Sequence, residues 1–299
     1  MSKKLILVTG ATASGKTNYS IELAKEIGSP IISCDSRQIY KELKIGTAPP
    51  TQQQLNSVKH YFIHSHSIFD NYTAGRYELE ALTLLEKLFK KFDTLIVVGG
   101  SGLYADALCY GIDHFPAADK SLRDSLTERI EKEGIESLRM ELKRLDPKSY
   151  QEIDIANPQR VIRALEVTLA TGKKFSDHKS YKPKNREFII ERLFIERERE
   201  QLYSRINNRV EEMMEAGLLE EAEQLYKYRN LVALKTVGYS ELFLYLDNRL
   251  KLDEAVELIK RNTRRYAKRQ ITWFKRYNSK QILWRESGGG EENKRGYHN

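Results

Sequence analysis

The sequence has few cysteines and no long apolar run, and these two absences exclude several classes of protein. Cys34 and Cys109 are the only cysteines among 299 residues, which excludes a disulfide-stapled scaffold and leaves no cysteine-based zinc motif. The longest apolar runs, such as 5–8 and 95–98, have the length of a strand, whereas a membrane helix needs about 20 apolar residues. The amino-terminal run is also too short for the apolar region of a signal peptide. We therefore expect a soluble, cytoplasmic protein without a membrane partner.

The composition is that of a folded protein with more than one substructure. Hydrophobic residues make up 40% and charged residues 31%, so the chain has enough apolar material for a core and too much for a disordered segment. A length of 299 residues predicts two domains, or one domain with a large insertion.

Acidic residues are missing from one strongly basic stretch near the carboxyl end. It contains Lys260, Arg261, Arg264, Arg265, Lys268, Arg269, Lys275 and Arg276. Without these eight, basic and acidic residues are equal in number, so the net charge of +8 comes from this stretch. Pairs that recur every four residues form one stripe on a helix. A solvated helix face is the alternative, but such faces usually mix both signs. The stripe predicts a polyanionic partner, with nucleic acid as the first choice.

Residues 10–17 read GATASGKT and fit the phosphate-loop pattern GxxxxGKS/T, between a predicted strand and a predicted helix. In such a loop the backbone N–H groups converge on a phosphate, the helix start and Lys16 add positive charge, and Thr17 offers a hydroxyl to Mg²⁺. A plain glycine-serine turn is the alternative, which the strand–loop–helix context disfavours. The expected phosphate-binding residues are Gly10, Ala11, Thr12, Ala13, Ser14, Gly15, Lys16 and Thr17. The motif does not identify the phosphate compound.

Short apolar runs alternate with amphipathic segments in the first third of the chain, which predicts a parallel sheet with helices on both faces. The predicted strands are 5–8, 31–34 and 94–98, and the predicted helices are 18–27 and 79–91. From about residue 116 the patterns are helical, apart from a late strand candidate at 188–190. We expect an α/β fold with a P-loop NTPase-like core over 1–115 and 196–286, C-terminal helices included. A mainly helical insertion over 116–195 and a flexible tail over 287–299 complete the prediction.

Asp35 directly follows the second predicted strand and precedes Ser36-Arg37-Gln38. P-loop NTPases usually hold Mg²⁺ in part with an acid that ends a second strand, and the strand at 95–98 ends in Gly-Gly-Ser instead. The carboxyl ends of parallel strands meet at one edge of the sheet. We therefore expect Asp35 beside the phosphate loop, as a metal ligand or as a general base. Helix capping is the alternative role.

Three further segments have two interpretations each. In 157–163, Asn-Pro predicts a helix start, where the cations Arg160 and Arg163 are unfavourable unless they bind an anion or Glu166. The run Gly99–Tyr104 predicts either close approach of a ligand or a helix start. His60, His64 and His66 lack a nearby acid or cysteine to complete a metal site, so we expect surface or packing roles. These residues indicate a phosphate loop and a polyanionic partner, and a small-molecule or nucleoside kinase and a non-catalytic RNA-binding P-loop protein both remain possible.

Taken together, these segments resemble the tRNA dimethylallyltransferase (tRNA isopentenyltransferase) family. The matching segments are GATASGKT (10–17), DSRQIY (35–40), IGTAPP (45–50), VGGSGLY (98–104), NPQRVIRALEV (157–167), GYSE (238–241) and TRRYAKRQITWF (263–274). They occur in the family's order. Ala11 stands where proline is usual, and His-Tyr-Phe-Ile-His at 60–64 replaces the more usual His-His-Leu-Ile-Asp.

The resemblance implies transfer of a dimethylallyl group from dimethylallyl diphosphate to the N6 amine of the adenine 3′ of the anticodon. It implies that 12–17 bind the donor diphosphate with Mg²⁺ on Thr17, that Lys16 and Thr17 assist catalysis, and that Asp35 is the base. The implied partner is the tRNA anticodon stem-loop, bound by a monomer without an obligate protein partner. The implied RNA contacts are Asp35, Ser36, Arg37, Gln38, Ser101, Arg123, Gln159, Arg160, Val161, Ile162 and Arg163, together with Arg264, Arg265, Lys268 and Arg269 of the basic stripe.

Overall fold

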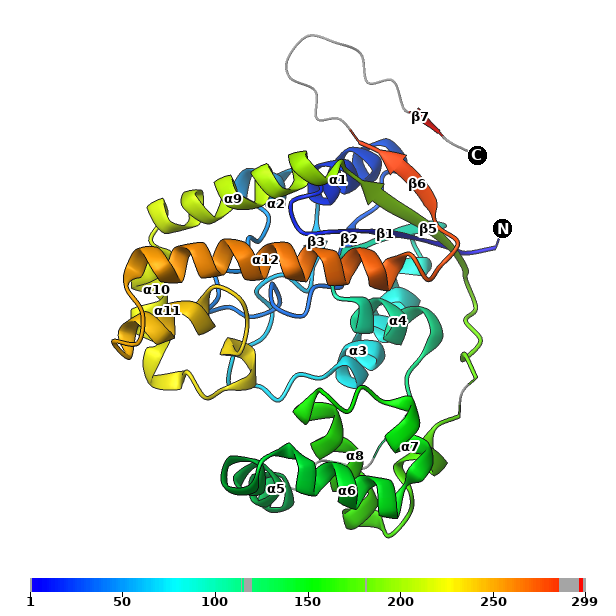
Figure 1. Cartoon of the computed structure of the whole chain (residues 1–299). Coiled ribbons are helices and arrows are strands. Elements are labelled where there is room, and N and C mark those ends of the chain that lie inside the picture. Colours follow the sequence, from blue (N-terminus) through cyan, green and yellow to red (C-terminus); the bar gives the residue numbers. More distant parts are fainter. Residues whose placement is uncertain (1, 114, 116–119, 181, 285–295, 298–299) are drawn as a thin grey trace. The chain divides into compact units, whose positions relative to one another are not determined.

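The computed structural model describes residues 2–113, 115, 120–180, 182–284 and 296–297. The chain forms two compact units (Figure 1). The core unit consists of Met1–Tyr110 and Asn185–Asn299, and the insertion unit consists of Gly111–Lys184. The chain therefore leaves the core unit once and returns to it once.

A seven-stranded sheet organises the core unit, in the order β3-β2-β4-β1-β5-β6-β7. The strands are β1 (Lys4–Gly10), β2 (Ile31–Ser33), β3 (His60–Tyr61), β4 (Thr94–Gly99), β5 (Ile189–Glu196), β6 (Lys280–Leu283) and β7 (Gly296–Tyr297). Strands β1 to β6 pair in parallel and β7 is antiparallel to β6. The predicted parallel sheet is confirmed. Because its strands are parallel, the loops after β1, β2 and β4 emerge at one edge.

Helices cover both faces of this sheet. Those of the core unit are α1 (Lys16–Ile27), α2 (Gln52–Ser57), α3 (Ala74–Phe89), α4 (Gly102–Tyr110), α9 (Arg199–Glu215), α10 (Leu218–Leu225), α11 (Tyr239–Leu246) and α12 (Leu252–Phe274), with 3-10 turns η2 (Tyr226–Tyr228) and η3 (Val232–Leu234). Helix α12 packs against α9, α11, α4 and β1 (Figure 1). The sequence patterns did not predict α2.

The apolar run of β1 serves two cores. Ile6 and Val8 pack in one cluster with Tyr19 of α1. Successive side chains of a strand point to opposite faces, so Leu5 and Leu7 lie on the other face, where they are buried as well. Burial on both sides explains why this strand is continuously apolar rather than alternating.

The insertion unit is helical, as predicted. It contains α5 (Lys120–Glu133), α6 (Ile135–Leu145), α7 (Pro147–Glu152), α8 (Pro158–Thr171) and the 3-10 turn η1 (Phe175–His178). Its core includes Leu126, Leu138 and Leu142. Asp146 is fully buried and accepts hydrogen bonds from the N–H and hydroxyl groups of both Ser149 and Ser176. Burial by itself would raise the pKa of this carboxyl, but the four hydrogen bonds leave it below its usual value.

The two points where the chain crosses between the units are fastened by Arg186. Its guanidinium donates to the carbonyls of Ala107 and Leu108, at 2.9 and 2.8 Å, and to the Glu78 carboxylate at 2.8 Å. The side chains of Arg186 and Glu78 are 9% and 2% exposed, so this is a buried ion pair. Residues just before and just after the insertion are thereby held together inside the core unit.

The expected domain boundaries need correction. The insertion was expected over 116–195, but the unit runs from Gly111 to Lys184 because β5 pairs with β1 along its whole length and belongs to the core sheet. Of the expected tail over 287–299, only Gly296–Tyr297 lies within the described residues. Within the described part of the chain, no helix combines the length and apolar content that a membrane crossing requires.

Candidate active site

The phosphate loop connects β1 to α1, as the motif predicts. Helix α1 starts at Lys16, directly after Gly15, so its amino-terminal N–H groups adjoin the loop. The Lys16 ammonium donates to the Ala11 carbonyl at 3.2 Å. Burial lowers the pKa of Lys16 to about 8, although the negative charge of Asp35 opposes the shift. The loop thus offers a positive helix end and a lysine that titrates near neutral pH.

Arginines that the sequence analysis did not single out support this loop. Arg205 of α9 donates to the Ala13 carbonyl at 2.9 Å, and Arg197 donates to the Ser14 carbonyl at 3.2 Å. Arg209, one turn after Arg205, donates to the Thr12 hydroxyl at 3.5 Å and also lowers the pKa of Lys16. Several cations therefore surround the loop, which is the environment that a phosphate requires.

Gln270 of α12 connects this helix to the loop edge. Its side chain is 4% exposed. The oxygen accepts from the Thr12 amide at 2.8 Å, and the nitrogen donates to the Gly100 carbonyl at 2.9 Å. One amide thereby joins the loops that follow β1 and β4 to the helix that carries the basic stripe.

Asp35 both caps a turn and lines a cavity. Its Oδ1 accepts from the amides of Arg37 at 2.9 Å and Gln38 at 3.2 Å, so Asp35 caps the turn at 36–39 and not a helix, as the alternative had it. Among the described residues, no hydrogen-bond partner is recorded for Oδ2, and Asp35 lines the same cavity as Lys16 and Thr17. One oxygen fixes the turn, which leaves the other for chemistry.

Other side chains of the Asp35 turn bind protein groups. Arg37 donates to the carbonyls of Val232 and Ala233 at 3.1 and 3.2 Å. Gln38 donates to the carbonyls of Thr47 and Ala48 at 3.2 and 2.9 Å. These two residues, expected as RNA contacts, thus also hold neighbouring segments in place.

The turn and the segment after it are fixed from two further sides. The Ser36 amide donates to the Ser101 hydroxyl at 2.9 Å, and Ser101 is also hydrogen-bonded to Tyr266 of α12. Burial, with the nearby charge of Asp35, raises the pKa of the Tyr266 phenol, so it stays protonated. From α10, the buried Glu221 carboxylate accepts from the three successive amides of 44–46.

These segments enclose one cavity of about 1180 Å³ within the core unit. Its walls come from the phosphate loop, the Asp35 turn, residues 44–55, α9, residues 235–241 and α12. Lys16, Thr17 and Asp35 face this cavity together with Arg205, Arg209 and Arg269. This volume exceeds the range typical of pockets for one small ligand. The cavity is therefore large enough for two reactants at once.

Some cations of the basic stripe on α12 bind other side chains of the protein, and others are exposed. Lys260 pairs with Glu211 and Glu257, both at 2.8 Å, and Arg264 donates to Asn207 at 2.6 Å. These two members of the stripe therefore have partners within the core unit, supplied by α9 and, for Lys260, also by Glu257 of α12. Arg261, Arg265, Lys268, Arg269, Lys275 and Arg276 are exposed. Arg276 also lies over the Trp273 ring, 4.0 Å from its centroid.

In the insertion unit, α8 starts as predicted, with Asn157 accepting from the Gln159 amide and Pro158 in the first turn. Gln159 and Arg160 are exposed. Val161 and Ile162 are buried in the core of the unit, so the expectation that their side chains contact RNA is corrected: they anchor the helix.

Arg123 and Arg163 share the buried carboxylate of Glu166, at 3.0 and 2.9 Å. The ion-pair alternative for Arg163 is thus confirmed. Two guanidinium groups therefore meet at one buried carboxylate in the insertion unit.

Comparison with known proteins identifies the family. The family model described as IPP transferase matches residues 38–277. This chain belongs to the IPP transferase family. It is 50% identical to a tRNA dimethylallyltransferase 2 of Azobacteroides pseudotrichonymphae over 282 residues, which are 94% of this chain and 91% of that protein. It is also 50% identical to a tRNA dimethylallyltransferase of Flavobacterium johnsoniae over 280 residues, 92% of this chain and 91% of that protein.

Solved structures of similar proteins have the same fold. The full-length tRNA isopentenylpyrophosphate transferase from Bacillus halodurans superposes with a TM-score of 0.65 at 34% identity, over 92% of this chain and 88% of that chain. A eukaryotic dimethylallyltransferase acting on tRNA superposes with a TM-score of 0.74 at 26% identity, over 94% of this chain and 74% of that chain.

In this member of the IPP transferase family, the glycines after β4 make room for protein side chains. A Cβ on Gly100 would lie 2.2 Å from the Gln270 amide nitrogen, and one on Gly102 would lie 2.3 Å from the Trp273 ring. Of the two interpretations of this run, the helix start is confirmed, since α4 begins at Gly102. The groups that closely approach these glycines are side chains of α12.

Replacing Gln270 by leucine should destabilise the core unit. The leucine leaves the Thr12 amide and the Gly100 carbonyl without their partner, which costs about 1–3 kcal/mol per buried group. We expect a lower free energy of unfolding in urea, followed by tryptophan fluorescence, because both tryptophans, Trp273 and Trp284, belong to the core unit. The exposed Thr272→Ala on the same helix is the matched control, and an equal loss in both variants would contradict the assignment.

Proposed function

We propose that this IPP transferase moves a dimethylallyl group from dimethylallyl diphosphate to the N6 amine of the adenine 3′-adjacent to the anticodon in tRNA. The observation that carries the proposal is the placement of a phosphate loop and the Asp35 carboxylate in one cavity large enough for a diphosphate and a purine. The relatives named as tRNA dimethylallyltransferases support the same reaction.

In the donor half of the reaction, negative charge develops on the diphosphate, which would lie in the phosphate loop. When the allylic carbon–oxygen bond breaks, the electron pair of that bond leaves with the diphosphate. The N–H groups at the start of α1, Lys16 and the guanidinium groups of Arg205 and Arg209 would stabilise this leaving group. Since an adenine amine is a weak nucleophile, we assign the larger part of the catalytic effect to this stabilisation.

On the acceptor side, Asp35 would receive the N6 proton as the new carbon–nitrogen bond forms. Its Oδ1 is occupied by two amides, which holds the carboxylate in one orientation. The adenine must leave its stack to enter the cavity, which costs least in an unpaired loop such as that of an anticodon.

The residues present fit a magnesium ion. Mg²⁺ in phosphate sites takes one or two protein ligands and completes its shell with water and substrate oxygens. The Thr17 hydroxyl, in the cavity beside the phosphate loop, fits that requirement. Bound there, Mg²⁺ would neutralise charge on the diphosphate.

The RNA would bind the exposed cations of α12 and, in the insertion unit, Arg123 and Arg163 together with the exposed Gln159 and Arg160. Arg265, Lys268 and Arg269 are the exposed members of the stripe that we assign to backbone phosphates. We propose that the protein acts as a monomer. We place the reaction in the cytoplasm, with tRNA as the partner.

Incubation of the protein with tRNA, Mg²⁺ and labelled dimethylallyl diphosphate tests the proposed function directly. We expect label in the tRNA, recovered as N6-(dimethylallyl)adenosine after digestion to nucleosides. Transfer of phosphate from ATP in a parallel reaction, without labelled tRNA, would support a kinase and contradict the proposal.

Replacing Asp35 by asparagine separates its two roles. In the variant Asp35→Asn, the side-chain amide oxygen can still cap the turn, but the side chain cannot take the N6 proton. We expect kcat to fall by about 10²–10⁴-fold, the usual contribution of a general base, with donor affinity unchanged. Single-turnover rates and equilibrium dialysis of the donor measure the two quantities, and full activity of Asp35→Asn would refute the base assignment.

The pH dependence should follow Lys16. Because burial lowers its pKa to about 8, its positive charge is present below that pH and lost above it. We expect kcat/KM for the donor to decline above pH about 8, since this parameter reports the ionisation of the free enzyme. In Lys16→Arg the guanidinium keeps its charge, so its residual activity should lack this inflection. A wild-type profile without a decline in that range would contradict the role of Lys16.

A further inference from the structure

An exposed aromatic surface lies beside the Asp35 turn and has no place in the reaction described so far. It consists of Phe69, Tyr226, Lys227, Tyr228, Arg229 and Val232, here called the Phe69 surface. We propose that this surface stacks against an unpaired nucleobase of the RNA substrate, next to the adenine that enters the cavity. This inference rests on the proposed function, because it assumes that the substrate is RNA.

The Phe69 surface exposes apolar side chains to an unusual degree. Phe69 is 60% exposed and Val232 is 70% exposed, the two highest values among the large hydrophobic residues described in the core unit. The Phe69 ring meets the Tyr228 ring edge-on, with centroids 4.9 Å apart and planes at 90°. Two segments distant in sequence thus bring aromatic rings together at the surface, and the Phe69 ring stays largely exposed.

The loop that carries Phe69 is held firmly at its first half. The carboxylate of Glu42 accepts from the Ser67 hydroxyl at 2.6 Å and from the Ile68 amide at 3.0 Å. Asp70 in turn accepts from the Ser67 amide at 2.9 Å. The residues on either side of Phe69 are therefore fixed while its own ring remains exposed.

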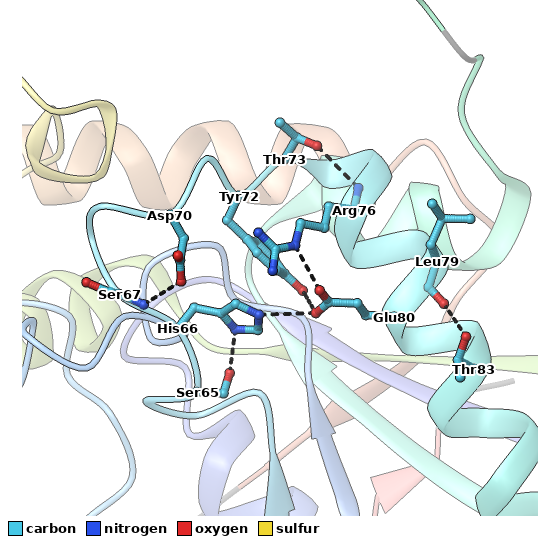
Figure 2. A network of polar contacts seen from close by, with 10 residues as sticks. All are labelled: Ser65, His66, Ser67, Asp70, Tyr72, Thr73, Arg76, Leu79, Glu80 and Thr83. Atoms are coloured by element: carbon cyan, nitrogen blue, oxygen red, sulfur yellow. Dashed lines mark hydrogen bonds and ion pairs between the residues drawn. The ribbon is translucent and has the colours of Figure 1, made fainter. Parts of the chain in front are cut away.

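The second half of the loop is fixed by Glu80 of α3 (Figure 2). This carboxylate contacts the His66 ring nitrogen Nε2 at 3.2 Å, the Tyr72 hydroxyl at 2.8 Å and the Arg76 guanidinium at 2.8 Å. His66, one of the three histidines singled out in the sequence, thus positions the loop. A surface that is ordered before binding loses less conformational entropy when a ligand arrives.

Both segments of the Phe69 surface are connected to the Asp35 turn. Tyr40, at the end of that turn, pairs with His66 in an isolated parallel β-bridge of the backbone. The Lys41 amide donates to the His66 carbonyl at 2.8 Å. On the other segment, Arg37 donates to the carbonyls of Val232 and Ala233. Both segments of the surface therefore adjoin the turn that carries Asp35.

Charge favours RNA as the occupant. The Lys227 ammonium lies 4.9 Å from the Tyr228 ring centroid, and the Arg229 guanidinium lies 4.4 Å from that of Tyr226. The acids of these segments, Asp70 and Asp247, accept hydrogen bonds from the Ser67 amide and the Tyr226 hydroxyl. Aromatic rings interleaved with cations are the combination that binds single-stranded nucleic acid, by stacking and by phosphate contacts.

The test uses an anticodon stem-loop RNA with 2-aminopurine at one unpaired position at a time, other than the target adenine. Stacking on an aromatic ring changes the fluorescence of this base. We expect the full-length protein to change it at one position, and Phe69→Ala to abolish that change. Loss of stacking on one base should raise the Kd for the RNA by about 5- to 100-fold. Phe69→Trp, which keeps a ring, should restore both signals, and Leu79→Ala, with a 59% exposed side chain, is the matched control.

Each outcome decides the proposal. If Phe69→Ala binds the RNA as the wild type does, with the same fluorescence at every position, the proposal is overturned and the surface belongs to a protein partner. An equal loss of affinity in Leu79→Ala would also overturn it, because the effect would then be a general one of apolar surface. Failure of the wild type to transfer a dimethylallyl group would refute the proposed function, whereas the fluorescence signal would still report on base stacking.

Discussion

The buried side chain of Gln270 holds together the parts on which the site depends. It accepts from the phosphate loop, donates to the loop after β4 and belongs to the helix whose exposed side carries the cations. A single side chain thus sets the register between the groups that would hold a leaving diphosphate and those that would hold a polyanion. Because the Gln270 side chain is buried, losing either hydrogen bond would leave a polar group of this amide without a partner.

The core of the fold and the centre of the site could be predicted because they depend on local patterns. The apolar runs of β1 and β4, the phosphate-loop motif and the position of Asp35 after β2 are each readable within a few residues, and parallel pairing brings them to one edge. The boundary of the insertion could not be predicted in the same way. Glu191 and Arg192 interrupt the apolar pattern of β5, which hides a strand that pairs along all of β1.

Residues whose role depends on a distant partner escaped prediction. Arg205 and Arg209 lie in a helix of mixed charge, where nothing local separates them from solvated side chains; only the packing of α9 brings them to the phosphate loop. Conversely, Lys260 belongs to an acid-free stretch but meets Glu211, which is 49 residues away in sequence. Asp35 caps a turn with Oδ1 and also lines the cavity, a combination that its position after β2 does not by itself reveal.

The hydrogen bonds of Arg186 have a consequence for how much the insertion unit can vary in length and structure. Because this guanidinium binds the carbonyls of Ala107 and Leu108, the two ends of the insertion are held together by residues of the core unit itself. The entropy of closing that insertion grows only slowly with its length. Helices between these ends can therefore be added, lost or exchanged with little thermodynamic effect on the sheet.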